Sequence, residues 1–186
     1  MLKRTVIGLL AVATALVGGF VVPSATADVE AAAVTITYDD SQAGEFVDVV
    51  AQGVAIWNDA VENVEIVRAE PGQHADITVE AFDGWPQATL GPVFPGGSAT
   101  VWYGRQAVVE GYDQVRIASH ELGHSLGLPD VKPGPCESLM SGSTGGVDCT
   151  NAQPNAEEIA QVEENYSGST APKPIQHKVI IGWLDN

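Results

Sequence analysis

The chain has 186 residues, a length that suits a single domain with a substantial core. Its 24 acidic and 8 basic residues give a formal net charge of −16, which argues against nucleic acid or an anionic membrane surface as a partner. Because 45% of the residues are hydrophobic, the composition is also not that of a disordered chain.

The start of the chain has the pattern of a secretory signal peptide. Lys3 and Arg4 precede an apolar run, which ends in a proline and in the small residues Ala-Thr-Ala that finish at Ala27. A membrane anchor is the alternative, since the run approaches spanning length, but the proline and the small-residue exit favour cleavage. We therefore expect residues 1–27 to be removed, residues 28–33 to be at most a short propeptide, and the product to be secreted and free of the membrane.

Four strands and one helix are predicted in the first part of the mature chain. The strands, which alternate apolar and polar side chains or are rich in β-branched residues, are residues 33–39, 64–69, 75–82 and 98–104. Residues 44–61 repeat apolar side chains at helical spacing, and Trp57 in that stripe is expected to lie in the core. Residues 84–97 hold too many glycines and prolines for a regular element and are predicted to be a loop. The strand that follows this loop has glycine on both sides and is predicted to lie at an edge of the sheet.

Two further helices are predicted in the second half of the chain. The first covers residues 113–126, and the second covers residues 154–166 and opens at Asn155. Residues 167–186 form a tail to which the sequence assigns no role. His177, within that tail, is expected to be solvated, with shielding of a cleft in an inactive form as the alternative.

The first of these two helices carries the sequence HELGH, from His120 to His124. Histidines four residues apart project from one face of a helix, and this spacing suits two nitrogen ligands of one Zn²⁺ ion. Glu121 would lie beside the metal, where its carboxylate can accept a proton from an attacking water molecule. The alternative is a surface helix with two incidental histidines, because so short a motif also arises by chance.

The residues after the motif predict a third ligand. Gly127 is suited to end the helix, because glycine adopts the left-handed conformation that reverses the chain. Pro129 prevents the helix from continuing. Asp130, six residues after His124, can then return to the metal. Three protein ligands and one open position are the pattern of a catalytic rather than a structural zinc site.

The two cysteines of the chain, Cys136 and Cys149, both lie in a polar, glycine-rich stretch. In an exported protein, two nearby cysteines most often form one disulfide. Ligation of a metal ion by these residues is the alternative, but neither of them belongs to a CxxC pair.

The stretch HELGHSLGLPD resembles the extended zinc signature of the metzincins. An aspartate as third ligand, in a small secreted chain, resembles the snapalysin family of small extracellular neutral metalloproteinases. The resemblance matches Met140, in SLMSG, to the methionine turn beneath the zinc ion, and Cys136 and Cys149 to the single disulfide of that family. It also divides the chain into a zinc metalloprotease domain at residues 34–166 and a tail at residues 167–186.

The resemblance implies an α+β fold in which a twisted mixed sheet packs on two long helices, with a small C-terminal subdomain after the zinc helix. It implies an endopeptidase, which we expect to be a monomer, that cleaves protein or peptide substrates with an aromatic residue just after the cut. The strand at residues 98–104 would be the antiparallel edge strand that pairs with an extended substrate. A structural Ca²⁺ ion is implied at Asp113, although this residue is also a good N-cap and that role is favoured.

Two other functions stay open. One is a zinc peptidase of another clan, with Glu157 or Glu158 as third ligand, although both residues suit the first turn of a helix, where the helix dipole favours acids. The other is a secreted zinc-binding module without enzymatic activity. Glu121 argues against such a module, because a binding site has no use for a base beside the metal.

The group that assists zinc at the oxyanion is not fixed by the resemblance. Several metzincins have a tyrosine just after the methionine turn, but here Ser141 and Gly142 follow Met140. The zinc ion would then provide most of the stabilisation of the negatively charged oxyanion. Lys132 or a loop amide is a candidate to assist it.

Overall fold

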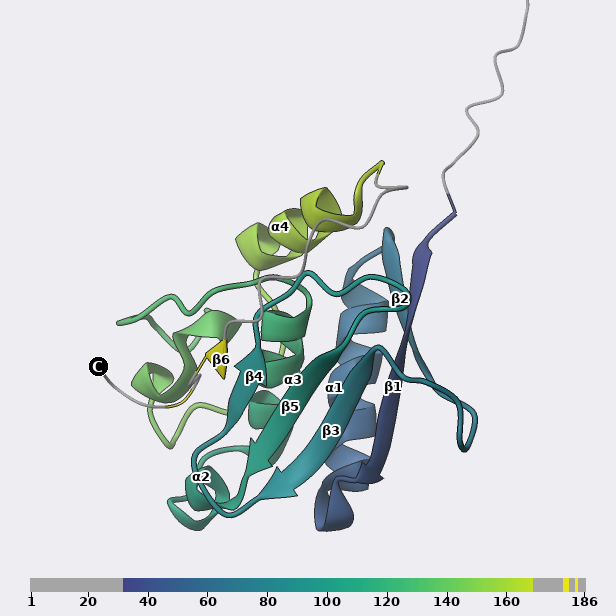
Figure 1. Ribbon diagram of the computed structural model, residues 1–186. Coiled ribbons are helices and arrows are strands. Elements are labelled where there is room, and N and C mark those ends of the chain that lie inside the picture. Colours follow the sequence, from purple (N-terminus) through teal and green to yellow (C-terminus); the bar gives the residue numbers. More distant parts are fainter. Residues whose placement is uncertain (1–31, 169–178, 181–182, 184–186) are drawn as a thin grey trace, which may run out of the picture. The chain divides into compact units, whose positions relative to one another are not determined.

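The computed structural model describes residues 32–168, 179–180 and 183 (Figure 1). The predicted signal peptide, most of the short propeptide and His177 lie outside the described residues. The strands are β1 (Val34–Gln42), β2 (Val64–Arg68), β3 (Ile77–Phe82), β4 (Gln87–Thr89), β5 (Ala99–Gly104) and β6 (Val179–Ile180). The helices are α1 (Val47–Ala60), α2 (Arg105–Val109), α3 (Gln114–Ser125) and α4 (Ala156–Tyr166), with 3₁₀ segments η1 (Gly44–Phe46) and η2 (Leu139–Gly145). Within these residues, no helix is both long and apolar enough to cross a membrane.

The strands form one mixed sheet in the order β2-β1-β3-β5-β4-β6. The neighbours among β1, β2, β3 and β5 run parallel, whereas β4 pairs antiparallel with both β5 and β6. Figure 1 shows α1 and α3 together on one face of this sheet. The predicted α+β architecture, a mixed sheet packed on two helices, is confirmed.

The prediction that residues 98–104 form the antiparallel edge strand is wrong. β5 is an interior strand, parallel to β3 on one side and paired with β4 on the other. The antiparallel strand is β4, which lies inside the stretch predicted to be a loop. Only three residues of that stretch belong to the strand, and the glycines and prolines around them conceal it in the sequence.

The two long helices approach each other closely at Gly53. A Cβ atom at this position would lie 3.0 Å from the backbone nitrogen of Ser119, so a side chain there would press on α3. One turn further along α1, Trp57 is fully buried, and its Nε1 donates a hydrogen bond of 2.8 Å to the carbonyl oxygen of Ser119. The predicted core role of Trp57 is confirmed, and its hydrogen bond ties α3 to the core.

The chain after α3 contains η2 and α4, and the predicted disulfide closes the loop that holds η2. Cys136 and Cys149 are bonded, with their Cα atoms 5.5 Å apart. α4 begins at Asn155, as predicted: its side chain accepts hydrogen bonds from the amides of Glu157 and Glu158, and the Glu158 carboxylate accepts one from the Asn155 amide. This reciprocal pair is a capping box, which satisfies amides that the first turn of a helix leaves free.

Replacing both Cys136 and Cys149 by serine should lower stability, because it removes a cross-link between residues 13 positions apart. The simple loop-entropy model gives a loss of about 3 kcal/mol in the free energy of unfolding, or roughly 6–12 °C in Tm for a domain of this size. A calorimetric melt measures the change. Val147→Ser, at an exposed position between the two cysteines, is the matched control. Equal melting temperatures in the double variant and the control would contradict a stabilising disulfide.

Candidate metal centre

Helix α3 carries His120, Glu121 and His124, and all three side chains are fully buried. The two imidazole rings have their centroids 4.6 Å apart. The helix starts at Asp113, whose Oδ1 accepts a hydrogen bond of 2.8 Å from the amide of Arg116. The N-cap role of Asp113 is therefore confirmed, while a Ca²⁺ ion at this residue finds no support among the described residues.

A backbone carbonyl holds each histidine and settles which ring nitrogen carries the hydrogen. Nδ1 of His120 lies 2.9 Å from the carbonyl oxygen of Leu139, and Nδ1 of His124 lies 2.7 Å from that of Leu128. Because a carbonyl oxygen only accepts, both Nδ1 atoms donate, and in a neutral ring this leaves the lone pair on Nε2. Burial, together with the neighbouring His120, lowers the pKa of His124 to about 3, so its ring is neutral. A neutral imidazole with a free Nε2 is the form that binds a metal ion.

The chain turns back toward the histidines at the end of α3. Gly127 has a φ of 99°, and its amide donates to the carbonyl oxygen of His124 at 2.9 Å. The amide of Leu128 donates to the carbonyl oxygen of Gly123 at 3.0 Å. These two hydrogen bonds form a Schellman motif, which the placement of the glycine predicts. The turn brings the Leu128 carbonyl to His124 and returns Asp130 to the helix.

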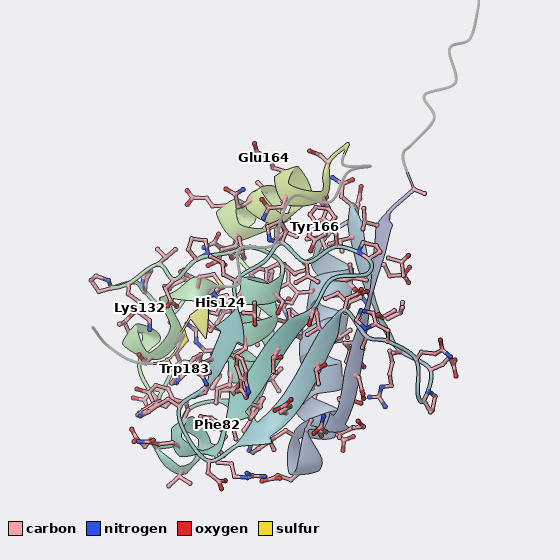
Figure 2. All side chains as sticks on the ribbon, viewed as in Figure 1. Phe82, His124, Lys132, Glu164, Tyr166 and Trp183 are labelled. Atoms are coloured by element: carbon pink, nitrogen blue, oxygen red, sulfur yellow. A yellow bond between two sulfur atoms is a disulfide. The ribbon has the colours of Figure 1, made fainter. Side chains whose placement is uncertain are left out.

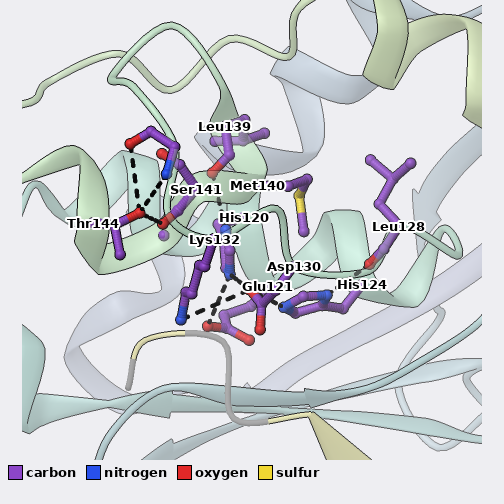
Figure 3. A network of polar contacts seen from close by, with 12 residues as sticks. His120, Glu121, His124, Leu128, Asp130, Lys132, Leu139, Met140, Ser141 and Thr144 are labelled. Carbon is purple, nitrogen blue, oxygen red and sulfur yellow. Dashed lines mark hydrogen bonds and ion pairs between the residues drawn. The ribbon is translucent and has the colours of Figure 1, made fainter. Parts of the chain in front are cut away.

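Asp130 completes a group of three side chains that could hold a metal ion (Figure 3). Its Oδ1 lies 3.4 Å from Nε2 of His120 and 3.6 Å from Nε2 of His124. Ligands about 2.0–2.1 Å from a tetrahedral Zn²⁺ ion stand about 3.4 Å from one another. The two separations from Asp130 therefore fit a single zinc ion, and the three ligand atoms all lie within 4.8 Å of one another.

Five buried polar atoms at this point have no hydrogen-bond partner among the described residues. They are Nε2 of His120 and of His124, both carboxylate oxygens of Glu121, and Oδ1 of Asp130. Each unsatisfied buried polar atom costs about 1–3 kcal/mol, so a folded chain seldom gathers several of them without a ligand. All five present lone pairs, which a cation and a water molecule can satisfy. The chemistry of the donor set thus fits a bound metal ion.

Glu121 lies beside this group rather than within it. Its Oε1 is 4.0 Å from Nε2 of His120. Burial raises the pKa of Glu121 well above its usual value; repulsion from Asp130 adds to the shift and the ammonium of Lys132 opposes it. A carboxylate whose pKa is raised holds a proton more tightly, which suits it to exchange protons during a reaction.

Met140 packs against α3 between the two histidines. A Cβ atom at Gly123 would lie 2.9 Å from Sδ of Met140 and 3.1 Å from a ring atom of Trp57. The glycine of the HELGH sequence therefore leaves the space that the methionine sulfur fills. Leu139, next in the chain, supplies the carbonyl that orients His120.

Two buried charges that sequence reasoning missed hold the segment around Met140. The Glu158 carboxylate accepts hydrogen bonds from Oγ of Ser138 and from the amides of Leu139 and Met140. The guanidinium of Arg116, 1% exposed, donates to four carbonyl oxygens of the same subdomain and to Oγ of Ser141. Because both residue types are usually solvated, no sequence signal marked them. Through Leu139 they position a histidine that neither of them touches.

The remaining candidates from the sequence lie at different distances from the group. Glu158 is committed to the backbone around Met140, and Glu157 is exposed in the first turn of α4, so the structure does not bring either alternative ligand to the histidines. Nζ of Lys132 lies 3.9 Å from Oδ1 of Asp130.

Trp183, for which no role was expected, is buried close to the metal group, with its ring centroid 5.0 Å from that of His120 (Figure 2).

Comparison with known proteins places the sequence of this chain in a family. Residues 33–168 match the Streptomyces extracellular neutral proteinase (M7) family. A protein of Streptomyces coelicolor named extracellular small neutral protease is 39% identical over 141 residues, which are 76% of this chain and 63% of that protein. A protein of the same name from Streptomyces caespitosus is 38% identical over 69% of this chain and 94% of its own length.

The chain spans only part of some relatives, 63% of the Streptomyces coelicolor protein and 59% of one from Streptomyces sp. strain C5. Among solved structures, a hatching enzyme zinc-protease of the medaka Oryzias latipes, high choriolytic enzyme 1, matches 53% of this chain and 46% of that one. Its sequence identity is 25% and its TM-score 0.41. On the strength of the sequence match, the chain belongs to the Streptomyces extracellular neutral proteinase (M7) family, as its resemblance to the snapalysins predicts.

Proposed function

We propose that this protein is a secreted endopeptidase that uses one Zn²⁺ ion to hydrolyse peptide bonds in proteins or peptides. His120, His124 and Asp130 would hold the ion, and Glu121 would be the general base. The proposal depends on one observation: three possible ligand atoms lie close together, and beside them is the buried carboxylate of Glu121, which has no hydrogen-bond partner among the described residues. Membership of a neutral proteinase family supports the same conclusion.

The residues around the metal group suit the chemistry of peptide hydrolysis. When bound, zinc supplies Lewis acidity, which polarises the peptide carbonyl and makes a water molecule easier to deprotonate. The Glu121 carboxylate accepts a proton from water as the water oxygen attacks the carbonyl carbon. Glu121 then passes this proton to the amide nitrogen, the C–N bond breaks, and a carboxylic acid and an amine result. The histidines keep their orientation because each Nδ1 is fixed by a backbone carbonyl.

Lys132 is proposed to assist at the developing oxyanion. Its ammonium lies 3.9 Å from Oδ1 of Asp130, at the margin of the metal group. The hydroxyl of Ser141, just after the methionine, is engaged elsewhere: it donates to carbonyl oxygens of Pro135 and Ser138. A fixed cation near the reacting carbonyl stabilises the negative charge that forms in the transition state.

The short strand β4 supports a way of binding an extended peptide. It is the antiparallel strand of the sheet and lies against α3, which carries the metal group. A peptide that pairs with β4 in the place of β6 would gain main-chain hydrogen bonds and would lie beside the histidines. The preference for an aromatic residue just after the cut is carried over from the family resemblance. Cleavage of peptides that differ only at that residue tests it.

The names of the relatives, which are called extracellular, support secretion of this chain. We keep residues 1–27 as a signal peptide, residues 34–166 as the protease domain and residues 167–186 as a tail. The protein is proposed to act as a monomer. A Ca²⁺ ion at Asp113 stays a prediction.

Glu121→Gln should keep the fold and the zinc ion but lose several decades of kcat/KM, because it removes the proton acceptor and leaves the ligands in place. Zinc per chain, Tm and casein hydrolysis are measured on the purified protein. Glu157→Gln, at an exposed acid on α4, is the matched control and should keep full activity. More than about a tenth of the wild-type rate in Glu121→Gln would place the base elsewhere.

The same assay separates a peptidase from a zinc-binding module without activity. A module would hold one zinc ion per chain and clear no casein, whether or not a chelator is present. Clearing that is lost on chelation and returns with added Zn²⁺ supports the peptidase.

Asp130→Ala should lose zinc on dialysis, because two of the three ligands then remain. Asp130→His supplies a nitrogen ligand from the same turn and should rebind zinc close to one ion per chain. Its activity should stay low, because an imidazole is longer than a carboxylate and the site tolerates little displacement. Atomic absorption measures zinc per chain. Glu157→Ala, which removes an alternative third ligand, should hold zinc like the wild type, and the reverse pattern would favour the other clan.

A further inference from the structure

The sheet edge beside the metal group is already occupied by a strand of the same chain. β6 pairs antiparallel with β4, with Val179 opposite Thr89 and Ile180 opposite Ala88. Figure 1 shows β6 as the last strand of the sheet, next to β4. An extended peptide that adds a strand to β4 needs the position that β6 takes.

Trp183 carries this contact from the sheet edge to the histidines. Its ring meets the ring of His120 edge to face, with the centroids 5.0 Å apart, and meets the ring of Tyr112 in the same way at 5.5 Å. The Trp183 side chain is 1% exposed, and the side chains of His120 and Glu121 are fully buried. We call Val179, Ile180 and Trp183 the tail contact. It covers the group that a substrate has to reach.

The tail contact is built less tightly than the core. The Nε1 hydrogen of Trp183 is buried without a hydrogen-bond partner among the described residues, which costs about 1–3 kcal/mol. Trp57, in the core, donates its Nε1 hydrogen to the carbonyl oxygen of Ser119. β6 adds only two residues of pairing to the sheet. These features describe a segment that binds its surface but can be displaced from it.

The tail contact also lies outside the family match, which ends at residue 168. The matched part of the chain contains the metal group and β4, whereas the segment beyond it supplies the strand and the ring that cover them. The surface and its occupant therefore belong to different parts of the sequence, and the occupant can be altered without changing a proposed ligand.

We propose that the edge of β4 and the adjoining face of His120 form one peptide-binding surface, and that the tail contact is its resident occupant. This inference rests on the proposed function, since a substrate would have to displace the tail contact before it is cut. A tethered occupant has an effective concentration on the order of millimolar, so no second molecule is required. The fraction of chains in which the surface is open then scales the apparent affinity for substrate.

Trp183→Ala in the full chain removes the ring that covers His120. In the active enzyme, kcat/KM for a peptide substrate should rise about tenfold, mainly through KM, which corresponds to a surface that is open in about one chain in ten. Trp102→Ala is the matched control: its neighbours on β5, Val101 and Tyr103, face the core, so Trp102 projects from the other face of the sheet. The control should leave kcat/KM unchanged. An unchanged kcat/KM in Trp183→Ala overturns the proposal.

A second measurement does not depend on hydrolysis. Each protein is loaded with Zn²⁺ and mixed with excess EDTA, and the release of zinc is followed over time. Trp183→Ala should release zinc several-fold faster than the wild type and Trp102→Ala, because the ring no longer covers His120. Faster release from a protein that hydrolyses no peptide would leave the tail contact standing and refute the proposed function. Equal release rates in all three proteins would refute the tail contact alone.

A synthetic peptide covers the case in which Trp183→Ala lowers stability. The peptide KVIIGWLDN, residues 178–186, is added to the Trp183→Ala protein together with substrate. It should inhibit competitively, and the same peptide with alanine in place of tryptophan should inhibit at least about tenfold more weakly. No inhibition by the tryptophan peptide at millimolar concentration, the order expected for a tethered occupant, would show that this segment does not occupy the surface.

Discussion

The carbonyl oxygens of Leu128 and Leu139 are the constraint on which the metal group depends, because they accept the Nδ1 hydrogens of His124 and His120 and fix both rings. The two carbonyls are placed in different ways. Leu128 is set by the Schellman turn at Gly127, only a few residues from the histidine that it orients. Leu139 reaches its histidine across the fold, and its position depends on contacts from α4 and α3.

Those contacts come from two buried side chains of opposite charge. Glu158 binds the amides of Leu139 and Met140, while Arg116 binds carbonyl oxygens on the other side of the same segment. Burial lowers the pKa of Arg116, and the charge of Glu158 opposes that shift. Removing one of a pair of buried charges is strongly destabilising, because the other is left without compensation. The subdomain after α3 is thus attached to the metal helix by charge as well as by apolar packing.

The features that the sequence predicts well are those fixed within one or two turns of chain. The helical spacing of His120 and His124, the helix end at Gly127 and the return of Asp130 all follow from local backbone rules, and the structure brings the three proposed ligands together. The capping box at Asn155 is equally local.

Contacts between distant segments could not be predicted in the same way. β4 is too short to show a periodicity, and its absence from the prediction moved the antiparallel edge to β5. Arg116 and Glu158 are residue types that usually lie in solvent, so only the fold reveals that they are buried. Trp183 lies in an apolar run, and a run of this kind does not say which surface it will cover.

The pairing of β6 with β4 also affects the tendency of one copy of the protein to associate with another. An uncovered strand edge presents free N–H and C=O groups and is a template for strands of neighbouring chains, which is a common route to aggregation. β6 covers the outer side of β4, so the sheet ends instead at a strand of only two residues, which is a poorer template. An edge that opens to admit a peptide is open to other copies of the protein as well, so access to the metal group and colloidal stability are controlled by the same short stretch of main chain.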